Sequence, residues 1–175
     1  MKQSDRVRRG LPPLMLFTLA SCASLPAEVP TRAPEGRGPA DIAQDERACV
    51  AYAESFPKDR SERYADCMIA RGYTVNVDLD ELGWIVGVAQ TRPHQPDAVR
   101  RDLAICDRLA DNTKSADVVT LTAEQEKSLE ILASQSRRTS LTVWDATQRR
   151  PNASRRLVAC LGERGYEIRP WVPLH

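Results

Sequence analysis

Cys67-Met68-Ile69-Ala70-Arg71-Gly72-Tyr73 recurs later in the chain as Cys160-Leu161-Gly162-Glu163-Arg164-Gly165-Tyr166. Both stretches read cysteine, an apolar residue, two variable positions and then Arg-Gly-Tyr. Glycine closes a helix easily because it adopts the left-handed backbone conformation, and the residues after it read as extended chain. The repeat therefore predicts an internal duplication, in which each copy ends as a helix followed by an extended segment.

A cysteine-bearing helix is also expected some way before each ending. Residues 41–56 carry apolar side chains on one helical face, at Ile42, Cys49, Tyr52 and Phe56. Residues 97–110 show similar spacing, at Val99, Leu103, Cys106 and Leu109. Each copy then reads as a helical hairpin.

Caps are expected at the second helix of each hairpin. Asp59, with Glu62 three residues later, forms a capping pair in the first copy, and Asn152 caps the helix in the second. The predicted fold class is mainly α, with two disulfide-stapled helical hairpins in tandem. The first unit spans residues 41–90, a linker spans 91–96, and the second unit spans 97–175.

The second copy is expected to carry an insertion over residues 112–151. Its cysteines are 54 positions apart, compared with 18 in the first copy. Within the insertion, Thr122 and Gln125 have the spacing of a capping box. The insertion either provides a distinguishing interaction surface or covers the core.

Four cysteines remain if Cys22 is set apart, and four allow three disulfide connectivities. The duplication favours two bridges within the hairpins, pairing Cys49 with Cys67 and Cys106 with Cys160. A metal site is disfavoured, because the chain has no Cys-x-x-Cys pair and its two histidines, His94 and His175, lie outside the cysteine units. No metal ion and no cofactor are expected.

A β-hairpin is predicted between the two units. Residues 74–79 alternate loosely between polar and apolar side chains, and residues 84–88 form a short apolar run. An acidic turn joins the two segments.

The N-terminus has the pattern of an export signal. Basic residues precede an apolar run, Leu11 to Ala20, which is about half the ~20 residues of a membrane-spanning helix. The run ends in Leu19-Ala20-Ser21-Cys22, which resembles the lipobox of bacterial lipoprotein precursors. This resemblance implies a signal peptide over residues 1–21 and a diacylglycerol-modified, acylated Cys22. The other reading is an ordinary signal peptide or an uncleaved apolar N-terminus.

The same resemblance gives an expected location. Ala23 is not aspartate, which fits sorting to an outer membrane, so the protein is expected on the inner leaflet of a Gram-negative outer membrane, facing the periplasm. Residues 22–40 carry Pro26, Pro30, Pro34 and Pro39 and are predicted to form a lipid-anchored tether.

The nearly neutral net charge argues against a general nucleic-acid-binding protein. The whole chain has a net charge of +1; residues 1–21 contribute four basic residues and one acidic residue, so the remainder carries about −2. The distribution is uneven: residues 41–81 hold ten acidic and five basic residues, and residues 137–169 hold eight arginines and three acidic residues. One interpretation is that the two oppositely charged parts dock on each other or on a second copy, and another is that the arginines are simply solvated at the surface. The third is an anionic partner, such as an acidic face of another envelope protein or a cell-wall anion, with Arg149, Arg150, Arg155 and Arg156 as candidate contacts.

No catalytic constellation is evident in the sequence. Ser55 and Lys58 match a Ser-x-x-Lys pattern, but the accompanying motifs of penicillin-recognising enzymes are absent. The Cys-apolar-x-x-Arg-Gly-Tyr ending resembles one found in small, poorly characterised lipoproteins of Gram-negative envelopes. The expected function is therefore structural or protein-interacting, without enzyme activity. The alternative is a small periplasmic hydrolase or an inhibitor of one.

Overall fold

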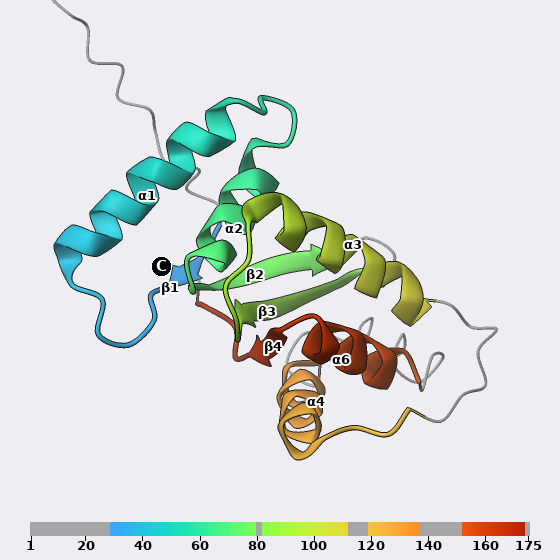
Figure 1. The fold of residues 1–175 in the computed structure, drawn as a ribbon. Helices are drawn as coiled ribbons and strands as arrows, with labels where there is room; N and C mark the ends of the chain where they lie inside the picture. Colours follow the sequence, from blue (N-terminus) through green and yellow to red (C-terminus); the bar gives the residue numbers. More distant parts are fainter. Residues whose placement is uncertain (1–28, 80–81, 112–118, 137–151, 174–175) are drawn as a thin grey trace, which may run out of the picture.

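The computed structural model describes residues 29–79, 82–111, 119–136 and 152–173. Helices cover one face of a small antiparallel sheet (Figure 1). The elements in chain order are β1 (Thr31–Arg32), α1 (Pro39–Glu54), α2 (Arg60–Ala70), β2 (Thr74–Leu79), β3 (Trp84–Gln90), α3 (Pro96–Asp111), α4 (Ala123–Ser136), α6 (Ala153–Glu163) and β4 (Tyr166–Arg169). The predicted mainly helical class with a small β part is confirmed.

The sheet runs in the order β1-β2-β3-β4, with each neighbouring pair antiparallel. Its centre is the predicted hairpin, in which Val75 pairs with Val88 and Leu79 with Trp84. Strands β1 and β4 extend this hairpin on both sides into a four-stranded sheet. Extended chain was expected after Gly165, where β4 lies, but β1 was missed because a strand of two residues carries almost no alternation signal.

The tether prediction also needs correction for residues 29–40. Thr31 and Arg32 pair with β2, and α1 begins at Pro39, where proline fits the first turn of a helix. The prolines in this segment suggested a solvated spacer, yet proline is compatible with edge strands and helix starts. Residues 22–28, the rest of the predicted tether, lie outside the described residues.

The core lies between the sheet and the helices. Val75, Val86, Val88 and Ile168 are almost fully buried. Helix α2 contacts β2 and β3, α6 contacts β4, and α1 packs against α2. Helix α4, from the predicted insertion, packs on β4 and α6. This part of the insertion therefore covers the core.

Two disulfides tie the helices together in pairs. Cys49 of α1 is bonded to Cys67 of α2, and Cys106 of α3 is bonded to Cys160 of α6. These are the pairs that the repeated sequence pattern favours. All four cysteines are buried.

The recurring Arg-Gly-Tyr has a structural role after α2. The Arg71 guanidinium donates to Asp45 Oδ1 at 2.5 Å, and the Tyr73 hydroxyl donates to Asp45 Oδ2 at 3.1 Å. Gly72 between them has φ +90°, which a residue with a side chain rarely adopts. Burial and the neighbouring Asp45 raise the pKa of Tyr73 to about 12, so its hydroxyl remains a donor.

The same arrangement follows α6. Arg164 donates to Asp102 Oδ1 at 2.6 Å, Tyr166 donates to Asp102 Oδ2 at 3.2 Å, and Gly165 has φ +86°. Each aspartate lies on the first helix of its disulfide-linked pair. We call each set of an aspartate and the arginine and tyrosine that bind it a bracket. Each bracket therefore fixes a helix end, the following strand and the partner helix relative to one another.

The predicted caps are only partly correct. Asp59 and Asn152 do stand at the N-cap positions of α2 and α6, but neither side chain makes a cap hydrogen bond. The capping box of α4 is confirmed, because Gln125 N donates to Thr122 Oγ1 at 3.3 Å and Thr122 N donates to Gln125 Oε1 at 2.8 Å.

The C-terminal segment after β4 crosses toward β2. Val172 and the Asn76 side chain exchange two hydrogen bonds, at 2.9 and 3.0 Å, and Trp171 Nε1 donates to Ile85 O at 2.9 Å. This path brings the backbone close to Gly87: a Cβ at that position would lie 2.5 Å from Arg169 O.

We therefore expect Gly87→Ala to lower the free energy of unfolding by roughly 3 kcal/mol, since backbone must move to accept the methyl group. Urea unfolding followed by circular dichroism measures this loss. Gly38→Ala is the control, because its Cβ would meet only Asp41 Oδ2 at an ordinary 3.6 Å, and we expect a loss below about 1 kcal/mol there. Equal losses in both variants would contradict the close approach at Gly87.

Candidate functional site

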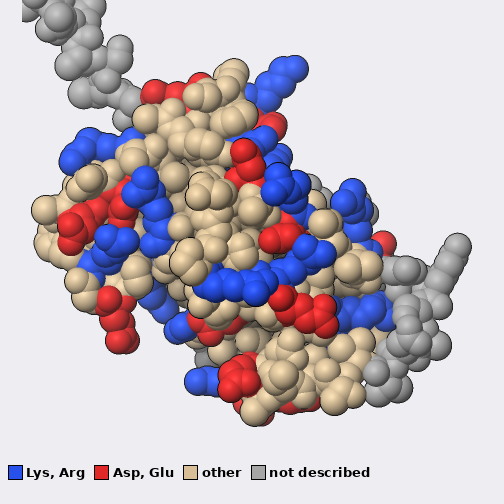
Figure 2. Space-filling view, in the orientation of Figure 1, with Lys and Arg blue, Asp and Glu red and all other residues tan. Residues whose placement is uncertain are grey.

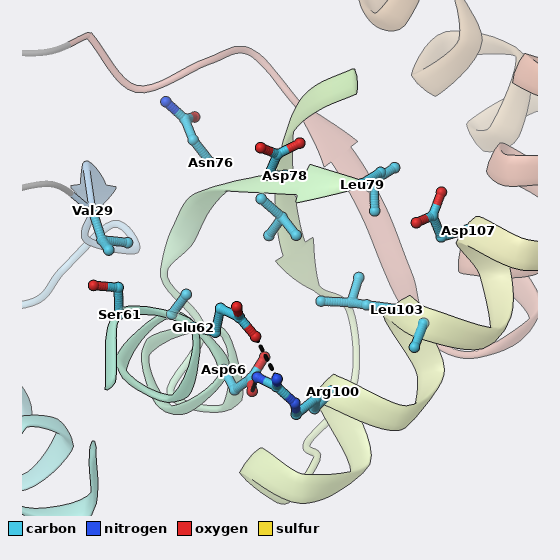
Figure 3. Close-up of a pocket in the computed structure, with 13 residues that line it drawn as sticks. Val29, Ser61, Glu62, Asp66, Asn76, Asp78, Leu79, Arg100, Leu103 and Asp107 are labelled. Carbon is cyan, nitrogen blue, oxygen red and sulfur yellow. Dashed lines mark ion pairs between the residues drawn. The ribbon is translucent and has the colours of Figure 1, made fainter. Parts of the chain in front are cut away.

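A half-open hollow of about 390 Å³ lies between α2, α3 and β2 (Figure 3). We call it the α2–α3–β2 pocket. Val29, just before β1, contributes to its lining. The residues that line it are Val29, Ser61, Glu62, Ala65, Asp66, Asn76, Val77, Asp78, Leu79, Arg100, Leu103, Ala104 and Asp107.

Acidic side chains outnumber basic ones in this lining. Glu62, Asp66, Asp78 and Asp107 line it together with a single cation, Arg100. In Figure 3 the side chains of Glu62 and Asp66 lie next to Arg100, whereas Asp78 and Asp107 lie apart from it. The Arg100 guanidinium is closely paired with Glu62. The lining therefore carries a formal excess of negative charge that Arg100 does not neutralise.

Asp66 is the unusual member of the group. Its side chain comes from α2, the residue is 4 % exposed, and its Oδ2 accepts no hydrogen bond. The nearest cation to Oδ2 is the Arg100 guanidinium at 3.7 Å, too long for a hydrogen bond. Leaving such an oxygen buried and unsatisfied is costly for the fold.

Burial raises the pKa of the Asp66 carboxyl to about 7. The charges of Arg100 and Arg63 and the polar contact with Arg100 lower it, and Glu62 has a smaller raising effect. Desolvation exceeds the attraction of the two guanidinium groups. A buried group whose pKa is this strongly perturbed, in a hollow of the surface, is a recognised sign of a functional site.

Asp107 is buried for a different reason. One of its carboxylate oxygens accepts the backbone N–H of Leu82 at 3.2 Å, so it fixes the chain just before β3 to α3. Asp78, in contrast, is exposed on β2 at the pocket rim. Asp66 is thus the buried carboxylate of this pocket that no backbone donor satisfies.

Apolar side chains complete the pocket. Leu79 and Ala65 are buried, and Val77 is packed against the core. With Leu103 of α3 they provide methyl-lined walls beside the carboxylates. The arrangement suits a molecule that combines an aliphatic part with a positive charge.

A second hollow, of about 460 Å³, lies against α4, α6 and β4. Gln125 and Ser128 of α4 line it, together with Gly162 of α6. None of the side-chain atoms that are buried without a hydrogen bond belongs to its lining in the described part of the chain. It therefore lacks the unsatisfied group that distinguishes the α2–α3–β2 pocket.

The arginines proposed as anion contacts lie elsewhere. Arg155 donates to Glu126 at 2.8 Å, and Arg156 donates to Ala110 O at 2.8 Å. Both guanidinium groups are therefore engaged within the protein. Arg149, Arg150 and Cys22 lie outside the described residues. On the face shown in Figure 2, basic and acidic side chains are interspersed.

The pocket brings together carboxyl groups rather than a nucleophile with a histidine or lysine base. Its lining includes Ser61 but no histidine, lysine or cysteine. His94 instead stacks on Tyr166, with ring centroids 4.5 Å apart. Among residues 29–79, 82–111, 119–136 and 152–173, no group of three or more His, Cys, Asp or Glu side chains could hold a metal ion.

Known proteins offer no guide to this site. Comparison with protein-family models, curated proteins and solved structures gave no match. Within the described segments, no helix is both long enough and apolar enough to cross a membrane.

Sequence reasoning missed Asp66, although a signal was present. Asp66 comes directly before Cys67 and Met68, the start of the repeated ending. The aligned endings place Ala159, immediately before Cys160, at the equivalent position. The carboxylate of Asp66 thus stands where the second copy has the methyl group of Ala159. This difference between the two copies was visible in the sequence.

Proposed function

We propose that this chain is a lipid-anchored lipoprotein of a Gram-negative envelope that faces the periplasm and acts by binding another envelope component. The observation that carries a binding role is the buried, unsatisfied carboxylate of Asp66 in an open pocket. Support for export comes from the two buried disulfides, which are typical of oxidising compartments. Support for the anchor comes from the Leu19-Ala20-Ser21-Cys22 sequence.

The fold is proposed to consist of two tandem copies of one β-α-α-β unit, each containing a disulfide-stapled helical hairpin. Helices α1 and α3 both have 16 residues and begin at a proline, and α2 and α6 both have 11 residues. The Asp45 and Asp102 brackets use the same atoms. Duplication of one unit accounts for these agreements.

The proposed anchor would hold the pocket near the membrane. Val29 lies seven positions after Cys22, and seven residue steps of fully extended chain span at most ~25 Å. Val29 lines the pocket. A lipidated Cys22 therefore keeps the pocket within roughly that distance of the lipid headgroups, so its ligand belongs to the layer next to the membrane.

Intact-mass spectrometry of the membrane-extracted protein tests the anchor. We expect a chain that begins at Cys22 and carries the added mass of diacylglycerol and an acyl group. A Cys22→Ser variant should lose this mass and leave the membrane fraction, because two or more acyl chains make the attachment essentially permanent. A chain that begins at Cys22 without acyl mass would refute the lipid anchor.

In-cell crosslinking tests the binding role. A photoreactive residue in place of Ser61, which lines the pocket, should capture a discrete envelope component, and capture should fall in the Cys22→Ser background. A photoreactive residue in place of Glu130, exposed on α4, is the matched control. Equal capture at both positions would contradict a role for the pocket.

A hydrolase is the second candidate, favoured by the same Asp66. A carboxyl with a raised pKa beside other carboxylates is the arrangement that glycoside hydrolases use for general acid catalysis. Binding is the better supported function, because Glu62 is paired with Arg100 and Asp107 accepts the Leu82 N–H. Release of reducing ends from purified cell wall, lost in Asp66→Asn, would favour the hydrolase.

A further inference from the structure

We propose that the α2–α3–β2 pocket binds an aliphatic primary ammonium ion, with Asp66 as its buried counter-ion. This inference rests on the binding role proposed above and names the ligand class. The ammonium belongs either to the lysine side chain of a partner protein or to a free small amine.

The first support is the unsatisfied oxygen. Asp66 belongs to the lining of the hollow, and its Oδ2, which has almost no exposed surface, accepts no hydrogen bond. An ammonium ion provides three N–H donors on a compact positive charge. One such group beside Oδ2 would supply both the hydrogen bond and the charge that this oxygen lacks.

The second support is the charge balance. Arg100 is shared among Glu62, Asp59 at 3.5 Å and Asp66 at 3.7 Å. Arg63, the other guanidinium near Asp66, bonds Asp97 at 2.6 Å. Both cations thus have closer carboxylate partners than Asp66, and the pocket keeps an excess of negative charge that favours a cationic ligand.

The third support comes from the two proposed copies of the unit. With the disulfide cysteines aligned, Asp66 corresponds to Ala159, and the pocket cation Arg100 corresponds to Ala43. Ala159 is buried in its own copy, so the fold accepts a methyl group at this position. The second copy therefore builds this position without a carboxylate, so the repeated unit by itself does not account for Asp66.

The walls define the rest of the ligand. Ala65, Val77, Leu79 and Leu103 provide apolar contact for methylene groups. No group of metal-ligating side chains accompanies Asp66 among the described residues. An amine on a short alkyl chain matches this combination better than a hydrated metal ion.

Isothermal titration calorimetry on the full mature protein in nonionic detergent tests the proposal. The probes are 1,5-diaminopentane and Nα-acetyl-lysine methylamide, and 1-pentanol serves as the uncharged comparison. We expect at least one amine to bind and 1-pentanol not to bind. Binding of the lysine derivative indicates a protein side chain as the source, and binding of the diamine alone indicates a free amine.

Two variants localise the binding. Asp66→Asn keeps the shape of the side chain and should weaken amine binding by about tenfold or more. Glu130→Gln removes a carboxylate from the exposed surface of α4 and should bind like the parent. Asp66→Ala reproduces the residue found at Ala159, so it should keep the native circular dichroism spectrum while losing binding.

The outcomes separate this inference from the proposed function. Folded protein that binds neither amine, or binds them equally well with Asp66→Asn, overturns the ammonium site. Crosslinking of a partner at the pocket would still support a binding role in that case. Amine binding by Cys22→Ser protein supports the site whatever the outcome for the lipid anchor.

Discussion

Replacing both Cys106 and Cys160 by alanine is expected to lower the free energy of unfolding by about 4 kcal/mol. The bridge closes a loop of 54 residues, and in the chain-entropy model a loop of that length restricts the unfolded chain by roughly this amount. The loss is large because domains of this size are usually stable by only about 5 to 15 kcal/mol. Urea unfolding measures it.

The matched comparison is the double replacement of Cys49 and Cys67. That bridge closes only 18 residues, so the same model gives about 3 kcal/mol. Both sulfur pairs are buried, which makes the lost packing similar. If the Cys49–Cys67 variant were clearly less stable than the Cys106–Cys160 variant, loop closure would not be the main contribution.

Asp66→Asn is expected to stabilise the protein at pH 8 and to leave its stability nearly unchanged at pH 4. The folded pKa of Asp66 is about 7, raised by burial from an ordinary 3.8. The folded state therefore binds the proton more tightly than the unfolded state between these values, and wild-type stability falls as pH rises from about 4 to 7. Three pKa units correspond to a loss on the order of 4 kcal/mol.

Charged groups around Asp66 contribute to its pKa and must stay the same in the comparison. Arg100, Arg63 and Glu62 act on Asp66, and Asp66 in turn acts on the Tyr166 phenol of β4. All of them remain in the variant, so the difference between wild type and Asp66→Asn isolates the one carboxyl. Urea unfolding at pH 4, 6 and 8 gives the comparison. Parallel stability curves for the two proteins would contradict the raised pKa.

The repeat in the sequence predicted much of the fold. Arg71-Gly72-Tyr73 and Arg164-Gly165-Tyr166 marked where two helices end, and the cysteine positions favoured the pairing that the structure contains. The reason is local, because glycine after a helix and cysteine on its apolar face have direct consequences for nearby chain. The sequence alone did not reveal the aspartates that Arg71 and Arg164 bind, since these lie far away along the chain.

Strand β1 and the α2–α3–β2 pocket could not be predicted, because both depend on contacts between distant segments. Thr31 and Arg32 form a strand only because β2 offers them a partner. Asp66 becomes a candidate site only because α3 and β2 close over it, which no helical periodicity reports. The edge strands and the pocket are both products of tertiary packing, and sequence pattern is weakest there.

Titration of the Asp66 carboxyl by carbon-13 NMR tests the central claim most directly. In the intact mature protein we predict a midpoint near pH 7. Saturating 1,5-diaminopentane should lower that midpoint by about one unit or more, because a positive charge beside a carboxylate favours its ionised form. A midpoint near the ordinary value that the amine leaves unchanged would contradict both the desolvated carboxylate and its role as a counter-ion.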